Sequence, residues 1–373
     1  MSPTVSSPTA PTPGPGPLHA VQVLGGGPAD DGDQVRSLAA GLVARGVRVT
    51  VCGPRDAEER YGFRAAGAHF LPMGPGPGAT SLTALRACCA DADIVHAHGT
   101  SAGLLASLGP PGRAARLVVS WQATPPDQPG ARAGLRRLAE RRIARSARVV
   151  LAASADLLDL ARERGARDAR LAPIAAPAAP PPPVEDPRQH KARAELGAVE
   201  RPLLFTAGPL TDDQGHDVLL DAAWAWRSYD PAPLLVIAGE GPARSRLQHR
   251  ITAEGLPVRL LGRRTDTTDL LAAADVAVAP GRSQASTTFA RDALHTGAPL
   301  VATTAGGVPE LARDAAQLVP HGEPEALARA VLGLLAAPAR RAELTAAGRA
   351  RARQWPTADE SVAHVLRIYD ELR

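Results

Sequence analysis

Short continuous runs of apolar residues recur along the first half of the chain, and a predicted helix follows most of them. In the first predicted helix Val35, Leu38 and Leu42 fall on one helical face. The apolar runs, which predict strands, cover residues 21–24, 47–52, 93–98, 117–121 and 148–152. Because these strands are apolar on both faces, the pattern predicts a parallel sheet covered by helices on both sides.

A proline-rich segment at residues 175–187 interrupts the alternation. Proline has no N–H group to donate to a sheet ladder, so this composition is typical of a stiff linker. Beyond it the alternation resumes, with strands predicted at residues 203–207, 234–238, 258–261, 276–279, 300–303 and 317–319. We therefore predict an α/β fold of two Rossmann-like, doubly wound parallel-sheet domains that face a central cleft.

These breaks divide the chain into a tail, two domains, a linker and a last helix. The first residues lack the basic and apolar regions of a signal peptide and are interpreted as a disordered tail. The helix after Trp355-Pro356 is a candidate to cross back onto the first domain. The predicted segments are 1–17 (tail), 18–174 (first domain), 175–187 (linker), 188–355 (second domain) and 356–373 (last helix). No run of about 18 apolar residues predicts a membrane-spanning helix.

Composition and charge exclude several classes of function. Aromatic residues make up 3% of the chain, too few for a platform on which nucleic-acid bases stack. The net charge is +4, yet Lys191 is the only lysine, so the chain has no P-loop. Lys191 lies in a polar segment after the linker, which is a poor position for a Schiff base with pyridoxal phosphate. We expect no nucleic-acid partner, no cofactor and no metal ion.

The three cysteines, Cys52, Cys88 and Cys89, show no C-x-x-C spacing. Neither a disulfide scaffold nor a zinc site is indicated by this pattern. Cys52 ends an apolar run and is predicted to be a buried core thiol. This use of cysteine favours a reducing compartment, and we expect a cytoplasmic location.

An ordered set of short motifs carries the chemistry of the chain. In the first half they are Asp93-Ile94-Val95-His96-Ala97-His98 and Val118-Val119-Ser120-Trp121. In the second half they are Ala207-Gly208-Pro209-Leu210, Gln214-Gly215-His216-Asp217, Ala238-Gly239-Glu240-Gly241-Pro242, Leu261-Gly262-Arg263 and Gly306-Gly307-Val308-Pro309-Glu310. In this order and spacing the motifs resemble those of the retaining, nucleotide-sugar-dependent glycosyltransferases of family 4, which have the GT-B fold. The resemblance covers nearly the whole chain after the tail.

The resemblance implies three groups of site residues. The donor, a nucleoside-diphosphate sugar, is expected at Gly208, Pro209, Gln214, Arg263, Ser286, Thr287, Asp292, Gly306 and Gly307. The reacting centre is expected at Gln122, Gln284 and His98, and the acceptor-side loop at Gly26 and Gly27. The acceptor itself is not indicated by any of these residues.

The chain departs from the family pattern at the positions that carry charge. Pro209 and Gln214 stand where the family has an arginine and a lysine for the donor diphosphate. Gln284 replaces a glutamate near the donor sugar, and Gln122 replaces a histidine near the reacting centre. Asp292 keeps the carboxylate expected to hold the ribose hydroxyls, shortened by one methylene. Each lost charge-assisted hydrogen bond is worth about 1.5–3 kcal/mol, so weak donor binding is predicted. Arg263 or Arg282 is a candidate to replace a lost cation.

Structural interpretations compete with the functional ones at several positions. His96 and His98 alternate on a strand and face the same way, as a metal pair or, in the favoured interpretation, as residues on the rim of the cleft. The loop at residues 25–27 lacks G-x-G-x-x-G spacing, which favours a plain turn. Asp292 could be an exposed helix residue. The arginine-rich helix at residues 131–145 is either a basic surface for a membrane or, in the favoured interpretation, a solvated outer face.

Two functions remain open on these grounds. The first is a glycosyltransferase that moves a sugar from a nucleoside-diphosphate sugar with retention of configuration. The second is a catalytically degenerate homologue that binds a sugar, a nucleotide or a protein partner. A phosphorylase-like or epimerase-like enzyme of the same fold is a third, less favoured interpretation.

Overall fold

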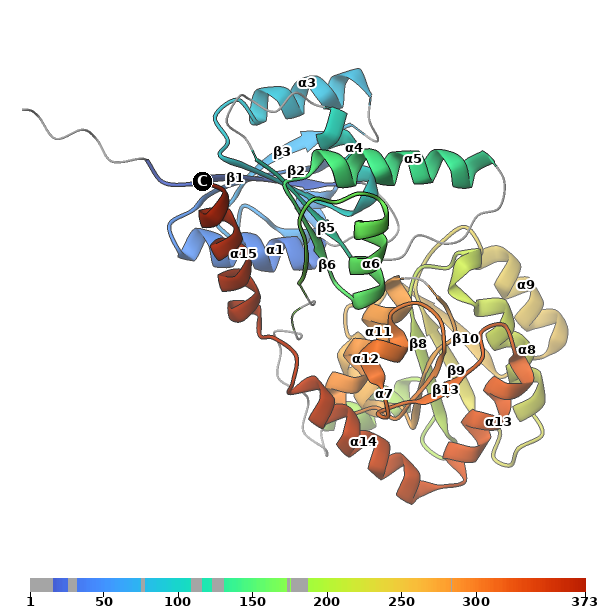
Figure 1. Cartoon of the computed structure of the whole chain (residues 1–373). Coiled ribbons are helices and arrows are strands. Elements are labelled where there is room, and N and C mark those ends of the chain that lie inside the picture. Colours follow the sequence, from blue (N-terminus) through green and yellow to red (C-terminus); the bar gives the residue numbers. More distant parts are fainter. Residues whose placement is uncertain are drawn as a thin grey trace, which may run out of the picture.

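The computed structural model describes residues 16–25, 32–74, 78–108, 116–122, 131–172, 175, 187–282 and 284–373, with backbone alone for Ala79, Ala131, Arg132 and Gln284. The described residues form two parallel sheets of seven and six strands, each covered by helices on both faces (Figure 1). This arrangement confirms the predicted fold class. The acceptor-side glycines Gly26 and Gly27 and most of the predicted linker lie outside the described residues.

The first sheet has the strand order β3-β2-β1-β4-β5-β6-β7. Its strands are β1 (His19–Leu24), β2 (Arg48–Pro54), β3 (His69–Met73), β4 (Ile94–His98), β5 (Arg116–Trp121), β6 (Val149–Ala152) and β7 (Ala169–Leu171). The order reverses between β1 and β4, which pair in parallel with Leu24 opposite His98. Loops leave the sheet in opposite directions at such a point, so the carboxyl ends of β1 and β4 border a crevice.

The helices of the first domain divide between the two faces of the sheet. They are α1 (Gly32–Ala44), α2 (Ala57–Tyr61), α3 (Ala79–Cys88), α4 (Gly99–Leu108), α5 (Ala131–Ser146) and α6 (Ala155–Glu163). Buried residues of α3 to α6 form the core on one face, and α1 and α2 cover the other together with the last helix of the chain, α15 (Ala358–Leu372).

The second sheet has the order β10-β9-β8-β11-β12-β13, with its own reversal between β8 and β11. Its strands are β8 (Leu203–Ala207), β9 (Leu234–Ala238), β10 (Val258–Gly262), β11 (Val276–Ala279), β12 (Leu300–Thr303) and β13 (Gln317–Val319). The helical segments are α7 (Pro187–Glu195), η1 (Asp212–Gln214), α8 (His216–Trp226), α9 (Arg244–Glu254), α10 (Thr267–Ala273), α11 (Gln284–Thr296), α12 (Val308–Ala312), α13 (Pro324–Leu335) and α14 (Pro338–Ala352).

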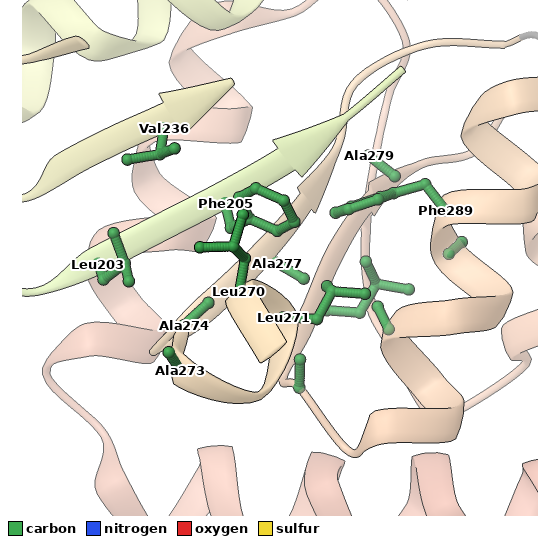
Figure 2. Close-up of a cluster of buried hydrophobic side chains, with 14 of the residues drawn as sticks. Leu203, Phe205, Val236, Leu270, Leu271, Ala273, Ala274, Ala277, Ala279 and Phe289 are labelled. Carbon is green, nitrogen blue, oxygen red and sulfur yellow. The ribbon is translucent and has the colours of Figure 1, made fainter. Parts of the chain in front are cut away.

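The core of the second domain fixes the position of α11. Phe289 on α11 packs against Phe205 of β8 with ring centroids 5.9 Å apart, and both side chains lie in the cluster shown in Figure 2. Leu270 and Leu271 of α10 complete this face. Since β8 and α11 are held together by buried aromatic rings, the loop after β8 and the first turn of α11 keep a fixed separation.

The last helix returns to the first domain. It begins at a capping box in which Thr357 and Glu360 exchange hydrogen bonds between side chain and backbone. Its buried face, including Val362 and Tyr369, packs against α1, where the absence of a side chain at Gly41 admits Val362. Figure 1 shows α15 beside α1, as the sequence had suggested for the segment after Pro356.

Candidate active site

Three loops of the second domain meet at the first turn of α11. A side chain at Gly281 would place its Cβ 2.3 Å from Ser286 Oγ and 2.7 Å from the carbonyl oxygen of Gln214. A Cβ at Gly306 would lie 2.7 Å from the carbonyl oxygen of Arg282. Glycine is therefore required at these positions, because only bare backbone allows the loops to approach so closely.

We call this convergence the glycine cradle, and it brings together most of the predicted donor residues. Thr287 on α11 faces Gly307, whose Cβ would lie 3.3 Å from the Thr287 methyl group. Gly208 follows β8, and its Cβ would lie 3.5 Å from Gln214 Oε1. The cradle consists of Gly208, Pro209, Gln214, Gly281, Arg282, Ser286, Thr287, Gly306 and Gly307. Free N–H groups at a helix N-terminus favour an anion, so the cradle is suited to a phosphate group.

The two candidate replacement cations lie in different places. Arg282 is exposed and belongs to the cradle, whereas Arg263 follows β10, the edge strand two positions away from β8. Gly262, next to Arg263, accepts a hydrogen bond from the Gly239 N–H at 2.8 Å, and a Cβ at Gly239 would lie 1.8 Å from the Gly208 carbonyl oxygen. A role for Arg263 at the donor therefore stays a prediction. Gln214 is 5% exposed and neutral, so it supplies no positive charge to the cradle. Arg282, which adjoins Gly306, is the cation among the cradle residues.

Asp292 lies two turns further along α11 and faces the first domain. Its carboxylate accepts hydrogen bonds from the guanidinium of Arg291, at 3.1 Å from Nη2 and 3.2 Å from Nε. Burial raises the pKa of Asp292, opposed by the charge of Arg291 and reinforced by the negative charge of Asp33 on α1. The Asp292 side chain is 39% exposed and is paired with Arg291, so Asp292 is a partly buried residue with an ion-pair partner rather than an isolated exposed one.

A cavity of about 680 Å³ occupies the first domain. Its walls are α1 and the first half of α15, its floor is the sheet at β4 to β7, and Arg291 reaches it from the second domain. Two of the predicted reacting-centre residues, His98 and Gln122, line it. The side chain of the third, Gln284, lies outside the described residues. The lining is completed by Asp33, Gln34, Arg36, Ser37, Leu38, Ala40, His96, Ser120, Trp121, Leu151, Leu171, Ala172, Ala175, Pro356, Ala358, Glu360, Ser361, Val362, His364 and Val365.

A buried chain of hydrogen bonds lies under this cavity. Tyr369 Oη accepts from Gln22 Nε2 at 3.0 Å and lies 2.7 Å from His96 Nδ1. His98 Nε2 lies 2.8 Å from Gln22 Oε1, which is an acceptor, so this nitrogen carries the proton. His96 Nε2 reaches Ser120 Oγ at 2.6 Å. The last helix thus helps to fix both histidine rings.

The two histidines are buried, and both line the cavity of the first domain, which agrees with the favoured sequence interpretation of residues that line the cleft. His96 is 1% exposed and His98 is 5% exposed, with ring centroids 4.2 Å apart. Burial lowers the pKa of both imidazoles, that of His98 to about 3. Within the described ranges no group of three histidine, cysteine or acidic side chains could hold a metal ion.

Sequence reasoning missed the partners that organise this region, namely Gln22, Tyr369, Asp33 and Arg291. One signal was available: Gln22 is a polar residue within the apolar strand β1 and is fully buried. A buried amide needs partners, so it predicts a polar network. The role of Tyr369 depends on the path of α15, which no local pattern specifies.

Comparisons with known families match the two halves of the chain separately. The family described as "Glycosyl transferase 4-like domain" matches residues 32–177, and the family described as "Glycosyl transferases group 1" matches residues 201–337. The two matches together cover more than half of the chain and follow each other in the order that the sequence motifs predict.

Curated relatives match over shorter stretches. A GDP-mannose-dependent alpha-(1-6)-phosphatidylinositol dimannoside mannosyltransferase of Mycobacterium tuberculosis is 34% identical over 167 residues, which is 44% of this chain and 43% of the relative. A D-inositol 3-phosphate glycosyltransferase of Jonesia denitrificans is 28% identical over 206 residues, which is 52% of this chain and 48% of the relative. The chain thus spans less than half the length of the relatives it matches.

Solved structures are similar over nearly the whole chain. HepE from Anabaena, in complex with UDP and glucose, has a TM-score of 0.79 at 18% identity. The match covers 95% of this chain and 99% of the HepE chain. Sucrose-phosphate synthase from Thermosynechococcus elongatus has a TM-score of 0.78 at 18% identity, with coverage of 95% and 99%. At these identities the likeness concerns the fold, and it confirms the expected two-domain GT-B architecture.

Proposed function

Because the chain belongs to the GT-B glycosyltransferases of the family-4 type, we propose that it transfers a sugar from a nucleoside-diphosphate sugar to an acceptor with retention of configuration. One observation carries the proposal: the bare backbone at Gly208, Gly281, Gly306 and Gly307 converges on the N-terminus of α11. Backbone N–H groups there can hold a diphosphate without the arginine and lysine of the family pattern.

The donor is held by two groups of residues in this proposal. The diphosphate lies in the glycine cradle, with Arg282 as the neighbouring cation, and Asp292 accepts hydrogen bonds from the ribose hydroxyls. As the diphosphate leaves, negative charge develops at the helix N-terminus, where the dipole of α11 stabilises it. The transfer as proposed needs no metal ion. GDP-mannose is the first donor to test, because several relatives are named as dependent on it.

We propose that the acceptor binds in the cavity of the first domain. His98 and Gln122 line the cavity among apolar walls that include Leu38, Leu151 and Val362. Such a lining suits a ligand that offers both hydroxyl groups and apolar faces. The names of the relatives each contain an inositol, so we propose a polyhydroxylated ring of this kind as the acceptor.

The test is transfer from radiolabelled GDP-mannose to inositol phosphate or to phosphatidylinositol, followed by NMR of the new linkage. We expect a product with the anomeric configuration of the donor. An inverted product would refute the retaining mechanism, and absence of product with every donor and acceptor pair would refute transfer.

A second candidate function is a binding protein without transfer, and Gln122, Gln214 and Gln284 favour it. An amide at Gln284 removes the negative charge that would stabilise a cationic sugar in the transition state. The combined change Gln122→His, Gln214→Lys, Gln284→Glu distinguishes the two functions. If only this variant hydrolyses the donor while the natural sequence binds it, the binding function is correct.

We also propose a cytoplasmic location with peripheral membrane contact through α5. Leu135 and Leu138 are 68% and 61% exposed on this helix, among the exposed Arg137, Arg141 and Arg142. Arginines beside exposed leucines suit an anionic lipid surface. No helix among the described residues is long and apolar enough to span a membrane.

Sedimentation with vesicles tests this contact. The protein should bind phosphatidylglycerol vesicles and not phosphatidylcholine vesicles, and the pair Leu135→Glu, Leu138→Glu should abolish binding. Val199→Glu is the matched control, since Val199 is 66% exposed on the second domain. Equal binding by the leucine variant would exclude α5 as the contact.

A further inference from the structure

Two cysteine thiols from different elements touch in the interior of the first domain. Cys52 lies on β2 and Cys88 is the last residue of α3. Their Sγ atoms are 3.1 Å apart, with the Cys52 thiol donating a hydrogen bond to Cys88. A disulfide bond is about 2.05 Å long, so the two sulfur atoms need to approach by about 1 Å. Sequence spacing did not suggest this pair, because 36 residues separate the two positions.

The two thiols differ in acidity and access. The hydrogen bond from Cys52 lowers the pKa of the Cys88 thiol, whereas the same bond and burial raise that of Cys52. Cys52 is 1% exposed, and Cys88 is only half-buried. Cys89, next in the chain, is buried, and burial raises its pKa to about 12. Cys88 is therefore the accessible nucleophile, and Cys52 is in position to resolve what forms on it.

We propose that Cys52 and Cys88 form a reversible oxidation site whose co-reactant is the disulfide of a low-molecular-weight thiol. The Cys88 thiolate attacks that disulfide, forms a mixed disulfide and releases one thiolate. Cys52 then loses its proton and attacks the Cys88 sulfur, which releases the second thiolate. The protein is oxidised by two electrons, and the small disulfide is reduced to two thiols.

The bond would tie α3 to the sheet. Cys52 and Cys88 belong to one packed region with Leu85 and Met73, so oxidation joins groups that already touch. The last turn of α3, which is otherwise held by side-chain packing, would be fixed covalently to β2. The site is separate from the glycine cradle, so its chemistry does not depend on the proposed sugar transfer.

The test is incubation of the folded full-length protein with oxidised glutathione, followed by acid quench, alkylation and peptide mapping. We expect a Cys52–Cys88 linked peptide, with Cys89 recovered as the one alkylated thiol, and full return to three thiols after dithiothreitol. Cys89→Ser is the matched control and should form the same link. Cys52→Ser should instead accumulate glutathione on Cys88, because its resolving thiol is missing.

Several results would overturn the proposal. Recovery of three alkylated thiols from the oxidised natural sequence would show that the pair does not react. A Cys88–Cys89 link would show that Cys89, and not Cys52, is the resolving thiol. Transient rather than stable glutathionylation of Cys52→Ser would show that Cys52 is not needed. If Cys52→Ser does not fold, the peptide map of the natural sequence decides the matter by itself.

Discussion

Replacement of Tyr369 by phenylalanine removes one hydroxyl group from the interior and keeps the ring that packs against the first sheet. The hydroxyl accepts from Gln22 Nε2 at 3.0 Å and reaches His96 Nδ1 at 2.7 Å. Gln22 and His96 are 0% and 1% exposed, so both groups lose their partner in the interior of the protein. A buried polar group left without a partner costs about 1–3 kcal/mol, and two such groups cost about 2–6 kcal/mol together. This is a large part of the roughly 5–15 kcal/mol that stabilises a typical domain.

Urea denaturation followed by circular dichroism measures this cost. The transition of the first domain should move to lower urea with an unchanged slope, because the variant exposes no additional surface on unfolding. Tyr229→Phe is the matched control, since Tyr229 is half-buried in the second domain. A loss below about 0.5 kcal/mol, the usual scatter of surface substitutions, would show that the Tyr369 hydroxyl does not hold the network together.

Further predictions concern the cradle and the histidines. Gln214→Lys restores a cation beside Gly208 and should tighten binding of GDP by roughly tenfold to a hundredfold in calorimetric titration; unchanged affinity would place residue 214 away from the diphosphate. Gly307→Val should weaken GDP binding more than tenfold, because its branches enter the cradle beside Thr287, while Gly333→Val on the open face of α13 should not. The pKa of His98 is lowered to about 3, so between the ordinary value of 6.5 and about 3 the unfolded chain binds a proton that the folded chain does not. Stability should therefore fall as pH decreases through this window, and His98→Asn should flatten that dependence; an equal slope in both proteins would refute the shift.

The parallel-sheet fold could be predicted because its strands are continuous apolar runs. The predicted strands of the second domain correspond to β8 to β13, and the misses were β3 and β7 in the first domain. β7 has three residues and β3 contains Pro72, so neither shows the pattern of a buried strand. Both lie at edges of the first sheet, where one side lacks a neighbouring strand and apolar continuity is not required.

The site could be predicted only in part. Motif order placed Gly208, Ser286 and Gly307 in one cradle because the carboxyl ends of parallel strands share one edge of the sheet. The same reasoning added Arg263, whose role at the donor stays a prediction, since spacing along the chain does not state how many strands lie between. The burial of His96 and His98 was missed for a related reason: α15 covers them from a part of the sequence more than 250 residues away.

The claim that the glycine cradle supports sugar transfer is tested most directly by the release of nucleoside diphosphate from a sugar donor. GDP release from GDP-mannose in the presence of phosphatidylinositol should be measured for the natural sequence and for Gly307→Val under identical conditions. The account predicts release by the natural sequence and its loss in Gly307→Val. Tight binding of GDP-mannose by the natural sequence without any release of GDP would contradict the account.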